Sequence, residues 1–245
     1  MISIIACTNR EHAMHNVFEN YERQLLEEKE LIIVLNHDRM DKNKWEKEAK
    51  KHKNVSVFQL PQKVSLGECY NFAIPKAQYP YIAKFDDDDY YSPYYLCEAI
   101  RGLQESGAAV VGKSTVFIYY MKRELLTIFN QGKEFVHVLQ ENELFEKFLL
   151  GATLVFRKNI YPEVSFEPIN VGEDTRFLRA CLQHNLPMYS TSRYNYVYLR
   201  YPQTHHTSTF QEYKLFEQCK ALRQTKDFQE ITTSSIDEIF KKKEG

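Results

Sequence analysis

Four consecutive aspartates, Asp86 to Asp89, follow the apolar run YIAKF at residues 81–85. Two carboxylates a few ångströms apart repel each other by about 1 kcal/mol in water and by several times that near a protein surface. A cation is therefore expected beside them. Carboxylate oxygens suit Mg²⁺ and Mn²⁺, which typically take one or two protein carboxylates together with phosphate oxygens of a substrate. An acidic turn that stabilises the next helix, worth about 0.3–1 kcal/mol, explains Asp89 but not all four.

A second acidic pair, Glu173 and Asp174, lies in the segment VGEDTRFLRACLQHN at residues 171–185. The pattern predicts a helix over 172–187 that begins at this pair. Carboxylates near a helix N-terminus stabilise the helix dipole, and the residues alone favour that interpretation. The alternative is a general base that takes a proton from an attacking hydroxyl.

An adjacent histidine pair, His205 and His206, lies in the polar segment YPQTHHTSTF at residues 201–210. Exposed histidines are usually solvated surface residues, yet a neutral imidazole also binds Mn²⁺. Both interpretations of the pair stay open.

Short apolar runs alternate with helix-length polar stretches through the first half of the chain. The apolar runs, rich in Ile and Val as buried parallel strands are, occupy residues 2–7, 30–36, 55–60 and 81–85. The predicted helices between them occupy 11–28, 40–52 and 66–77. This alternation predicts an α/β fold with a parallel sheet, whose ligands bind at the carboxyl ends of the strands. The aspartates follow one such end, and Ser92 with Pro93 predicts that the next helix starts directly after them.

The second half mixes strands, hairpins and helices, and its strand order cannot be predicted from one sequence. Predicted strands occupy 114–121, 124–129, 134–139, 151–159 and 188–201, and a further helix is expected at 142–150. We therefore divide the chain into a first half at 1–112 and a second half of the same domain at 113–226. The tail at 227–245 has few apolar residues and is expected to be disordered.

Composition excludes several classes of function. Thirty-two Lys plus Arg against 33 Asp plus Glu leave a formal charge of -1, so nucleic acid is not an expected partner. The 5 cysteines are scattered and lack the spacing of a zinc site, which favours reduced thiols and a cytoplasmic location. No apolar run approaches the roughly 20 residues that span a bilayer, so no transmembrane segment is expected.

Three segments together resemble family 2 glycosyltransferases of the GT-A fold. KVSLGECYNFAIPKAQYPYIAKFDDDDYYSPYYL at 63–96 is similar to the stretch in which a Gly and an Asn precede a strand, an Asp-x-Asp signature and a Pro-led helix. SIIACTNR at 3–10 resembles the opening strand of the family, and VGEDTRF at 171–177 resembles its Glu-Asp helix start. The resemblance spans residues 2–206. It implies a mostly parallel central sheet with helices on both faces and a smaller, mixed, acceptor-side extension.

The resemblance also implies an activity and a set of roles. The activity is transfer of a sugar, with inversion, from a nucleotide-sugar to a saccharide or other hydroxyl acceptor, assisted by Mn²⁺ or Mg²⁺. A UDP-sugar is the favoured donor, although uracil, guanine and thymine stay open at the base. Asp174 would be the catalytic base, and Asp88 with His206 would hold the metal. The residues expected to bind the nucleotide-sugar are Thr8, Asn9, Arg10, Asp38, Lys63, Asn71, Asp86 and Asp87. The segments Thr8 to Arg10 and Asn36 to Asp38 would border the base.

Some positions depart from the family pattern or have a second interpretation. Ala6 and Thr8 stand where the family has a Pro or Thr and an aromatic residue, and Asp38 is the nearest carboxylate after the second strand. Asn71 and Gly67 could be structural, as a polar anchor and a close backbone approach. A nucleotidyltransferase is the alternative enzyme, but ACTNREH at 6–12 has no glycine for a phosphate loop. A non-catalytic scaffold that binds nucleotide or metal is the third alternative.

Overall fold

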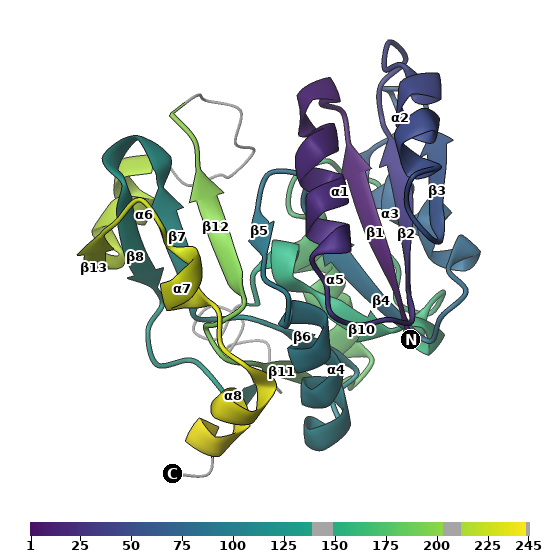
Figure 1. Cartoon of the computed structure of the whole chain (residues 1–245). Helices are drawn as coiled ribbons and strands as arrows, with labels where there is room; N and C mark the ends of the chain where they lie inside the picture. The colour runs from purple at the N-terminus through teal and green to yellow at the C-terminus, as the bar shows by residue number, and fades with distance from the viewer. Residues whose placement is uncertain (139–148, 203–211, 244–245) are drawn as a thin grey trace.

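Two β-sheets stand side by side in the protein (Figure 1). The computed structural model describes residues 1–138, 149–202 and 212–243. In this part of the chain the larger sheet has the strand order β3-β2-β1-β4-β10-β6-β11-β9, and the smaller has the order β13-β8-β7-β12-β5. The strands of the larger sheet are β1 (Ile2–Thr8), β2 (Lys29–Leu35), β3 (Val55–Gln59), β4 (Tyr81–Phe85), β6 (Val110–Gly112), β9 (Val136–Val138), β10 (Val155–Arg157) and β11 (Met188–Ser190). Those of the smaller sheet are β5 (Tyr90–Tyr91), β7 (Val116–Tyr120), β8 (Leu125–Phe129), β12 (Tyr196–Arg200) and β13 (Cys219–Gln224).

The first four strands are parallel and bring their carboxyl ends to one edge of the larger sheet. Thr8 pairs with Leu35 and Ala6 pairs with Phe85, so the residues that follow β1, β2 and β4 emerge together. β3 extends the parallel part beyond β2, whereas β10 pairs antiparallel with both β4 and β6. The predicted strands at 2–7, 30–36, 55–60 and 81–85 are confirmed to within one residue at each end.

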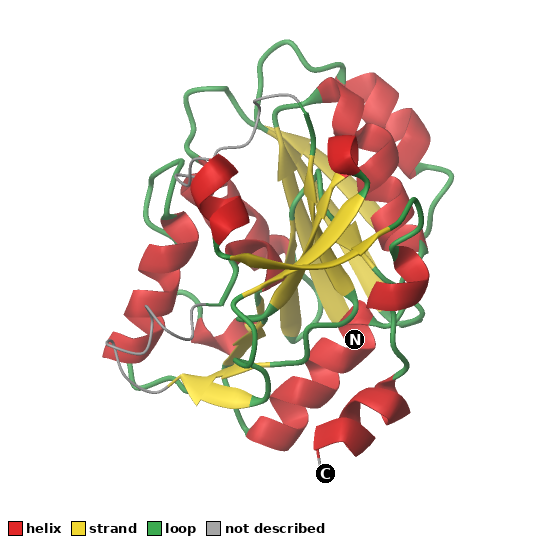
Figure 2. Cartoon of the chain, turned by 90° about the vertical axis from the view of Figure 1, so that its left-hand side faces the viewer, coloured by secondary structure: helices red, strands yellow, loops and turns green. Residues whose placement is uncertain are grey.

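Helices cover both faces of the larger sheet, as Figure 2 shows. The helices are α1 (Met14–Glu22), α2 (Lys42–Ala49), α3 (Leu66–Ala73), α4 (Tyr95–Ser106), α5 (Glu173–Gln183), α6 (Glu212–Glu217), α7 (Gln229–Thr232) and α8 (Ile236–Lys243). Alternate residues of β1 enter different cores because successive strand side chains point to opposite faces. Ile4 packs in the core that contains Phe18, Trp45 and Leu96 of α1, α2 and α4. Ile5 packs in the core that α3 and α5 cover.

Local sequence signals set some helix starts but not that of α4. Ser65 accepts from the backbone N–H of Glu68, whose carboxylate in turn accepts from the Ser65 backbone, which is a capping box at the start of α3. The predicted start at Ser92 and Pro93 is wrong, because α4 begins at Tyr95. The Ser92 hydroxyl instead donates to Asn195 Oδ1 at 2.7 Å.

Two predictions about the second half need correction. The single strand expected at 188–201 is two strands, β11 in the larger sheet and β12 in the smaller, so the chain crosses between sheets at this point. The tail expected to be disordered contains α7 and α8, with Ile239 and Phe240 almost fully buried. The helix expected at 142–150 falls mostly on residues 139–148, outside the described part.

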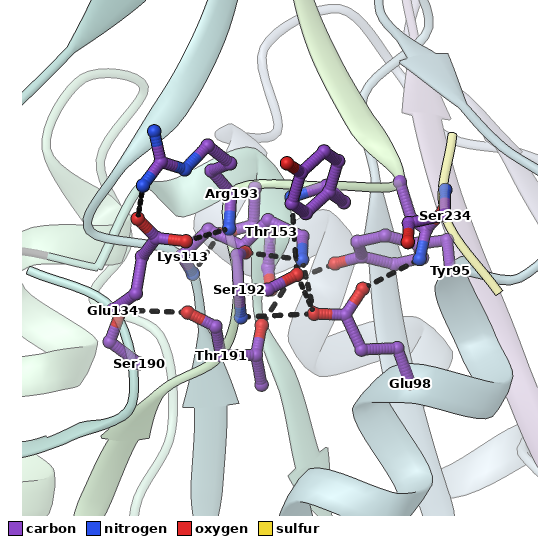
Figure 3. Close-up of polar contacts among 12 residues, drawn as sticks. Tyr95, Glu98, Lys113, Glu134, Thr153, Ser190, Thr191, Ser192, Arg193 and Ser234 are labelled. Atoms are coloured by element: carbon purple, nitrogen blue, oxygen red, sulfur yellow. Dashed lines mark hydrogen bonds and ion pairs between the residues drawn. The ribbon is translucent and has the colours of Figure 1, made fainter. Parts of the chain in front are cut away.

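A buried polar network joins the two sheets where the chain crosses between them (Figure 3). Lys113 follows β6, and its Nζ lies 2.9 Å from Glu98 Oε1 of α4 and 2.8 Å from the carbonyl of Ser192. Ser192 follows β11 and donates from its N–H and hydroxyl to the same Glu98 oxygen. Asn195 Nδ2 donates to the second oxygen at 2.9 Å. The Glu98 carboxylate of α4 therefore holds two connections between the sheets, the one from β6 to β7 and the one from β11 to β12.

Among the described residues no helix combines the length and the apolar character needed to cross a membrane.

Candidate active site

A cavity of about 360 Å³ opens at the carboxyl edge of the parallel strands. The ends of β1, β2 and β4 supply the lining residues Thr8, Asn9, Arg10, Asn36, Asp86, Asp87 and Asp88. The remaining walls come from Cys7, Gln62, Leu66, Tyr70, Asn170 and Tyr198. Of the predicted site residues, the structure thus brings Thr8 to Arg10 and Asp86 to Asp88 together around one cavity. A cavity therefore lies at the strand edge where the sequence predicted a ligand site, and three of the four aspartates line it.

Different partners stabilise three of the four aspartates at the cavity. The buried Lys84 of β4 places its Nζ 2.6 Å from Asp86 Oδ1. Arg10 Nη1 lies 3.0 Å from Asp87 Oδ1 and 2.6 Å from Asp88 Oδ2, and the Thr8 hydroxyl donates to Asp87. Lysine and arginine therefore supply much of the positive charge that the run of aspartates requires. Burial and the Asp88 charge raise the pKa of Asp87, while Arg10 and Thr8 oppose that shift.

The fourth aspartate, Asp89, faces away from the cavity and ties the turn to the smaller sheet. It is about 1% exposed, and it accepts from the Tyr196 hydroxyl at 2.5 Å and from the Leu199 N–H at 3.1 Å. The sequence had suggested that Asp89 stabilises the start of α4, but Asp89 does not cap this helix. Two amides of α1 hold the backbone of the same turn, since Asn16 donates to the carbonyls of residues 87 and 89 and Asn20 donates to the second of these.

The acidic pair at the start of α5, Glu173 and Asp174, lies close to Lys84, the residue that pairs with Asp86. Glu173 is about 5% exposed and its Oε1 lies 4.0 Å from Lys84 Nζ. Burial raises the pKa of Glu173 to about 7, Lys84 opposes the shift, and Asp174 adds to it. Asp174 is half-buried and does not line the cavity, but its charge acts on Lys84 together with those of Asp86 and Glu173.

The Asp174 carboxylate fits against a glycine. A Cβ at Gly151 would lie 1.8 Å from Asp174 Oδ2, so only glycine leaves room at that position of the 3₁₀ turn Gly151–Thr153. Asp174 Oδ1 accepts from the Thr175 N–H at 2.6 Å. The Asp174 carboxylate is therefore held in place by Gly151 and by the Thr175 N–H.

Several predicted site residues lie elsewhere. Asp38 and Lys63 are exposed and do not line the cavity, and an Asp38 oxygen accepts from the Gln62 N–H at 3.4 Å. Asn71 also lies outside the lining, because its amide donates to the Phe166 carbonyl at 2.7 Å and accepts from the Phe166 N–H at 3.0 Å. Asn71 is thus the polar anchor that the sequence left as its second interpretation. His206 lies outside the described residues.

Sequence reasoning missed four residues that matter here: Gln62, Asn170, Tyr198 and Lys84. Of the segment Asn36 to Asp38, which was expected to border the base, Asn36 lines the cavity and Asp38 does not. Lys84 carried a signal, as a lysine inside an otherwise apolar strand. Tyr198 carried none, because it belongs to the smaller sheet, whose position depends on contacts distant in the chain.

Comparison with known proteins places the chain in a family. The model of glycosyl transferase family 2 matches residues 3–161, more than half of the chain. No match was found among curated proteins. Three crystal structures of S. aureus TarS 1–349 share the fold: the protein alone (16% identity, TM-score 0.62), with UDP-GlcNAc (16%, 0.63) and with UDP (17%, 0.61). They cover 81%, 85% and 82% of this chain, which spans 60%, 61% and 61% of theirs.

These similarities agree with the architecture described above. The TarS structures are too distant in sequence to show more than the fold, and the chain spans about three-fifths of their length. The α/β core with a large mixed sheet and helices on both faces is the GT-A arrangement predicted from the sequence. With a family match that covers both the strands and the aspartates of the cavity, the chain belongs to glycosyl transferase family 2.

Proposed function

We propose that the protein transfers a sugar, with inversion, from a nucleotide-sugar to an acceptor hydroxyl, with the help of a divalent cation. The observation that carries this proposal is the cavity. It lies at the carboxyl ends of strands that belong to the family 2 match, and Asp86, Asp87 and Asp88 line it. Its volume of about 360 Å³ lies in the usual range for small-ligand sites. The TarS structures with UDP-GlcNAc and UDP support a UDP-sugar as the donor.

Amide side chains support binding of the nucleoside. Asn9, Asn36, Gln62 and Asn170 line the cavity, and amides supply both donors and acceptors for the edges of a base and a ribose. Asn36 is held in place because its Nδ2 donates to the carbonyls of Pro61 and Val64 at 3.0 and 3.1 Å. Arg10 is the cationic side chain in the lining that we expect to face the diphosphate.

Asp174 is the group that we assign to proton transfer. In an inverting reaction the acceptor hydroxyl attacks the anomeric carbon while a carboxylate takes its proton, a role worth about 10²–10⁴ in rate. Asp174 supports this role because it is fixed against Gly151 and lies near the acidic turn, close enough to share the charge of Lys84 with Asp86.

The donor set fits a hard cation. Among the described residues no group of three or more His, Cys, Asp or Glu side chains is placed to hold a metal ion by itself. Mg²⁺ and Mn²⁺ at nucleotide sites need only one or two carboxylates, since phosphate oxygens and water complete the shell. Asp88 would hold the ion, with Asp86 beside it in the lining and His206 a further candidate ligand. A bound cation neutralises the charge that develops on the leaving diphosphate.

Replacing Asp88 tests the cation. We expect UDP to bind wild type in the presence of Mn²⁺ and to bind at least about 10-fold more weakly after chelation or in Asp88→Asn. Isothermal calorimetry with and without EDTA measures all four cases. Asp41→Asn, at an exposed cap of α2, is a control that should bind like wild type. Equal UDP affinity in all four cases would contradict a cation held through Asp88.

A nucleotide panel tests the function as a whole. Thermal shifts with UDP, GDP, dTDP and CDP, each with Mn²⁺, should show stabilisation by one of them, because a ligand of the folded state raises its stability. The matching nucleotide-sugars are then assayed for hydrolysis and for transfer to hydroxyl acceptors. Binding with no turnover of any donor would favour a non-catalytic scaffold, and release of pyrophosphate from a nucleoside triphosphate would favour a nucleotidyltransferase.

A further inference from the structure

Lys84 is a buried cation in the centre of the larger sheet. It is about 3% exposed and lies in β4 between Ala83 and Phe85, both also buried. Moving a charged ammonium out of water costs several kcal/mol unless partners compensate it. Burial alone would lower the pKa of Lys84, but the carboxylates of Asp86, Glu173 and Asp174 outweigh that effect and raise it. Lys84 is therefore charged, and its charge is shared.

The partners of Lys84 come from two segments that are distant in the sequence. Asp86, whose Oδ1 lies 2.6 Å from Nζ, belongs to the cavity lining. Glu173, whose Oε1 lies 4.0 Å from Nζ, is the first residue of α5 and the neighbour of Asp174. The ring of Tyr70, another lining residue, lies 5.2 Å from Nζ and closes the space beside it.

The backbone of Lys84 contacts the segment that follows the Gly151–Thr153 turn. Its N–H donates to the Leu154 carbonyl at 2.9 Å, directly after the 3₁₀ turn that contains Gly151. Gly151 is the residue against which the Asp174 carboxylate rests. Lys84 thus contacts the acidic turn through its side chain. Its side chain also contacts the start of α5, and its backbone contacts the segment after Gly151, the two segments that hold Asp174.

We propose that Lys84 is a positioning residue that sets the separation between the donor-binding Asp86 and the proton-accepting Asp174. This inference rests on the glycosyl transfer proposed above. Without the ammonium, Asp86 and Asp174 would lose their common counter-ion, and their mutual repulsion would push the turn and α5 apart. A displacement of about 1 Å between reacting groups is enough to cost roughly 100-fold in rate.

Substitution of Lys84 should therefore separate turnover from nucleotide binding. In Lys84→Met, which keeps the length and removes the charge, we expect kcat to fall by roughly 10–100-fold. We expect the Kd for UDP with Mn²⁺ to change by less than about 3-fold, because Lys84 does not line the cavity and every lining residue remains. Lys84→Arg keeps the charge and should recover part of kcat. Steady-state kinetics and calorimetry on the same preparations give the two quantities.

Lys113 offers a matched control. It is also a fully buried lysine in an ion pair, with Glu98, and neither residue lines the cavity. Lys113→Met should lower the melting temperature, as Lys84→Met does, but leave kcat per UDP-binding site unchanged. If both variants lose kcat only in proportion to folded protein, Lys84 is a structural residue and the proposal is overturned. Should Lys84→Met fail to fold, Lys84→Gln, which keeps hydrogen bonds without charge, replaces it in the same comparison.

Crystal structures make the test independent of activity. We expect the Asp86 and Asp174 carboxylates to lie farther apart in Lys84→Met or Lys84→Gln than in wild type, and to be unmoved in Lys113→Met. Carboxylates that superimpose on wild type would overturn the positioning role even if turnover falls. An inactive wild type with the expected displacement in the variants would instead remove the proposed function and leave the positioning role standing.

Discussion

The side chains around Asp86 to Asp89 divide one stretch of charge among separate tasks. Asp86 is paired with Lys84, Asp87 and Asp88 share Arg10, and Asp89 is used to attach β12. Arg10 contacts both Asp87 and Asp88, so it would keep Asp87 as a partner if Asp88 bound a metal ion. We therefore expect Asp88 to be the carboxylate that releases the Arg10 guanidinium and binds a metal ion when a nucleotide binds.

Asp174→Asn is expected to remove turnover and spare binding. The substitution is nearly isosteric, so the contact with Gly151 and the hydrogen bond from the Thr175 N–H can persist. We expect kcat for transfer and for slow donor hydrolysis to fall by about 10²–10⁴, with the Kd for UDP unchanged. Glu167→Gln, an exposed acid in the segment before α5, is the control. A lower melting temperature with normal kcat would show that Asp174 acts only at the helix start.

Glu173 should make stability depend on pH. Its pKa is raised from 4.5 to about 7, chiefly by burial. Between these values the folded state keeps a proton that the unfolded state has lost, so raising the pH favours unfolding. Each pKa unit is worth about 1.4 kcal/mol, and wild type should lose on the order of 1–3 kcal/mol relative to Glu173→Gln between pH 5 and pH 8. Denaturant titrations of both proteins measure this difference, which would stay constant if Glu173 were ionised throughout.

At this scale the sequence predicted residue types better than partners. The aspartates and Arg10 could be chosen because charge beside a predicted strand end is visible in a single sequence. Asp38 and Asn36 are two positions apart, and which of them faces the cavity depends on where β2 ends. Lys84 was overlooked because its partner Glu173 lies in a distant part of the chain.

Among the elements, α3 and the segment before α5 show how closely the walls of the cavity approach each other. A Cβ at Gly67 would lie 1.9 Å from the carbonyl oxygen of Glu167, and the Gly67 N–H donates to the Ile169 carbonyl at 3.1 Å. The Leu66 N–H donates to Asn170 Oδ1 at 2.9 Å. The glycine therefore lets the helix start touch the segment that delivers Asn170 to the cavity.

Gly67→Ala is expected to damage this wall. The added methyl must displace backbone, which costs about 1–3 kcal/mol and shifts Asn170. We expect a lower melting temperature and weaker UDP binding together. Gly107→Ala is the control: nothing lies within 4 Å of its Cβ, but its φ of 69° is strained for alanine, so only stability should fall. Normal UDP affinity in Gly67→Ala would show that the Asn170 wall contributes nothing to binding.

Element positions were predictable where patterns are local. The parallel strands of the first half needed only apolar periodicity, whereas the start of α4 depended on Asn195 capturing the Ser92 hydroxyl from far along the chain. The segment 188–201 had the composition of one strand, but the chain leaves the strand conformation between β11 and β12, where Ser192 and Asn195 donate to Glu98. Composition alone could not reveal these partners.

For the molecule as a whole, the Glu98 and Lys113 pair determines how the two sheets are joined. Removing one member of a buried pair leaves the other uncompensated, which typically costs about 3–5 kcal/mol. We expect Glu98→Gln to lose free energy of unfolding of this size in a denaturant titration, with UDP affinity per folded protein unchanged. Glu48→Gln, in an exposed pair with Lys51, should change stability little. Comparable losses in both variants would contradict the role given to the buried network.

The attachment of Asp89 to β12 has a consequence for folding during synthesis. The acidic turn leaves the ribosome early, but the Tyr196 hydroxyl and the Leu199 N–H that complete it are 107 and 110 residues further on. β10, which separates β4 from β6 in the larger sheet, is also made late. A nascent chain that has produced only its first strands therefore has an open β4 edge and an Asp89 without its native partners. Nucleotide binding should appear late and abruptly as the chain grows, which makes it a sensitive reporter that this protein has finished folding.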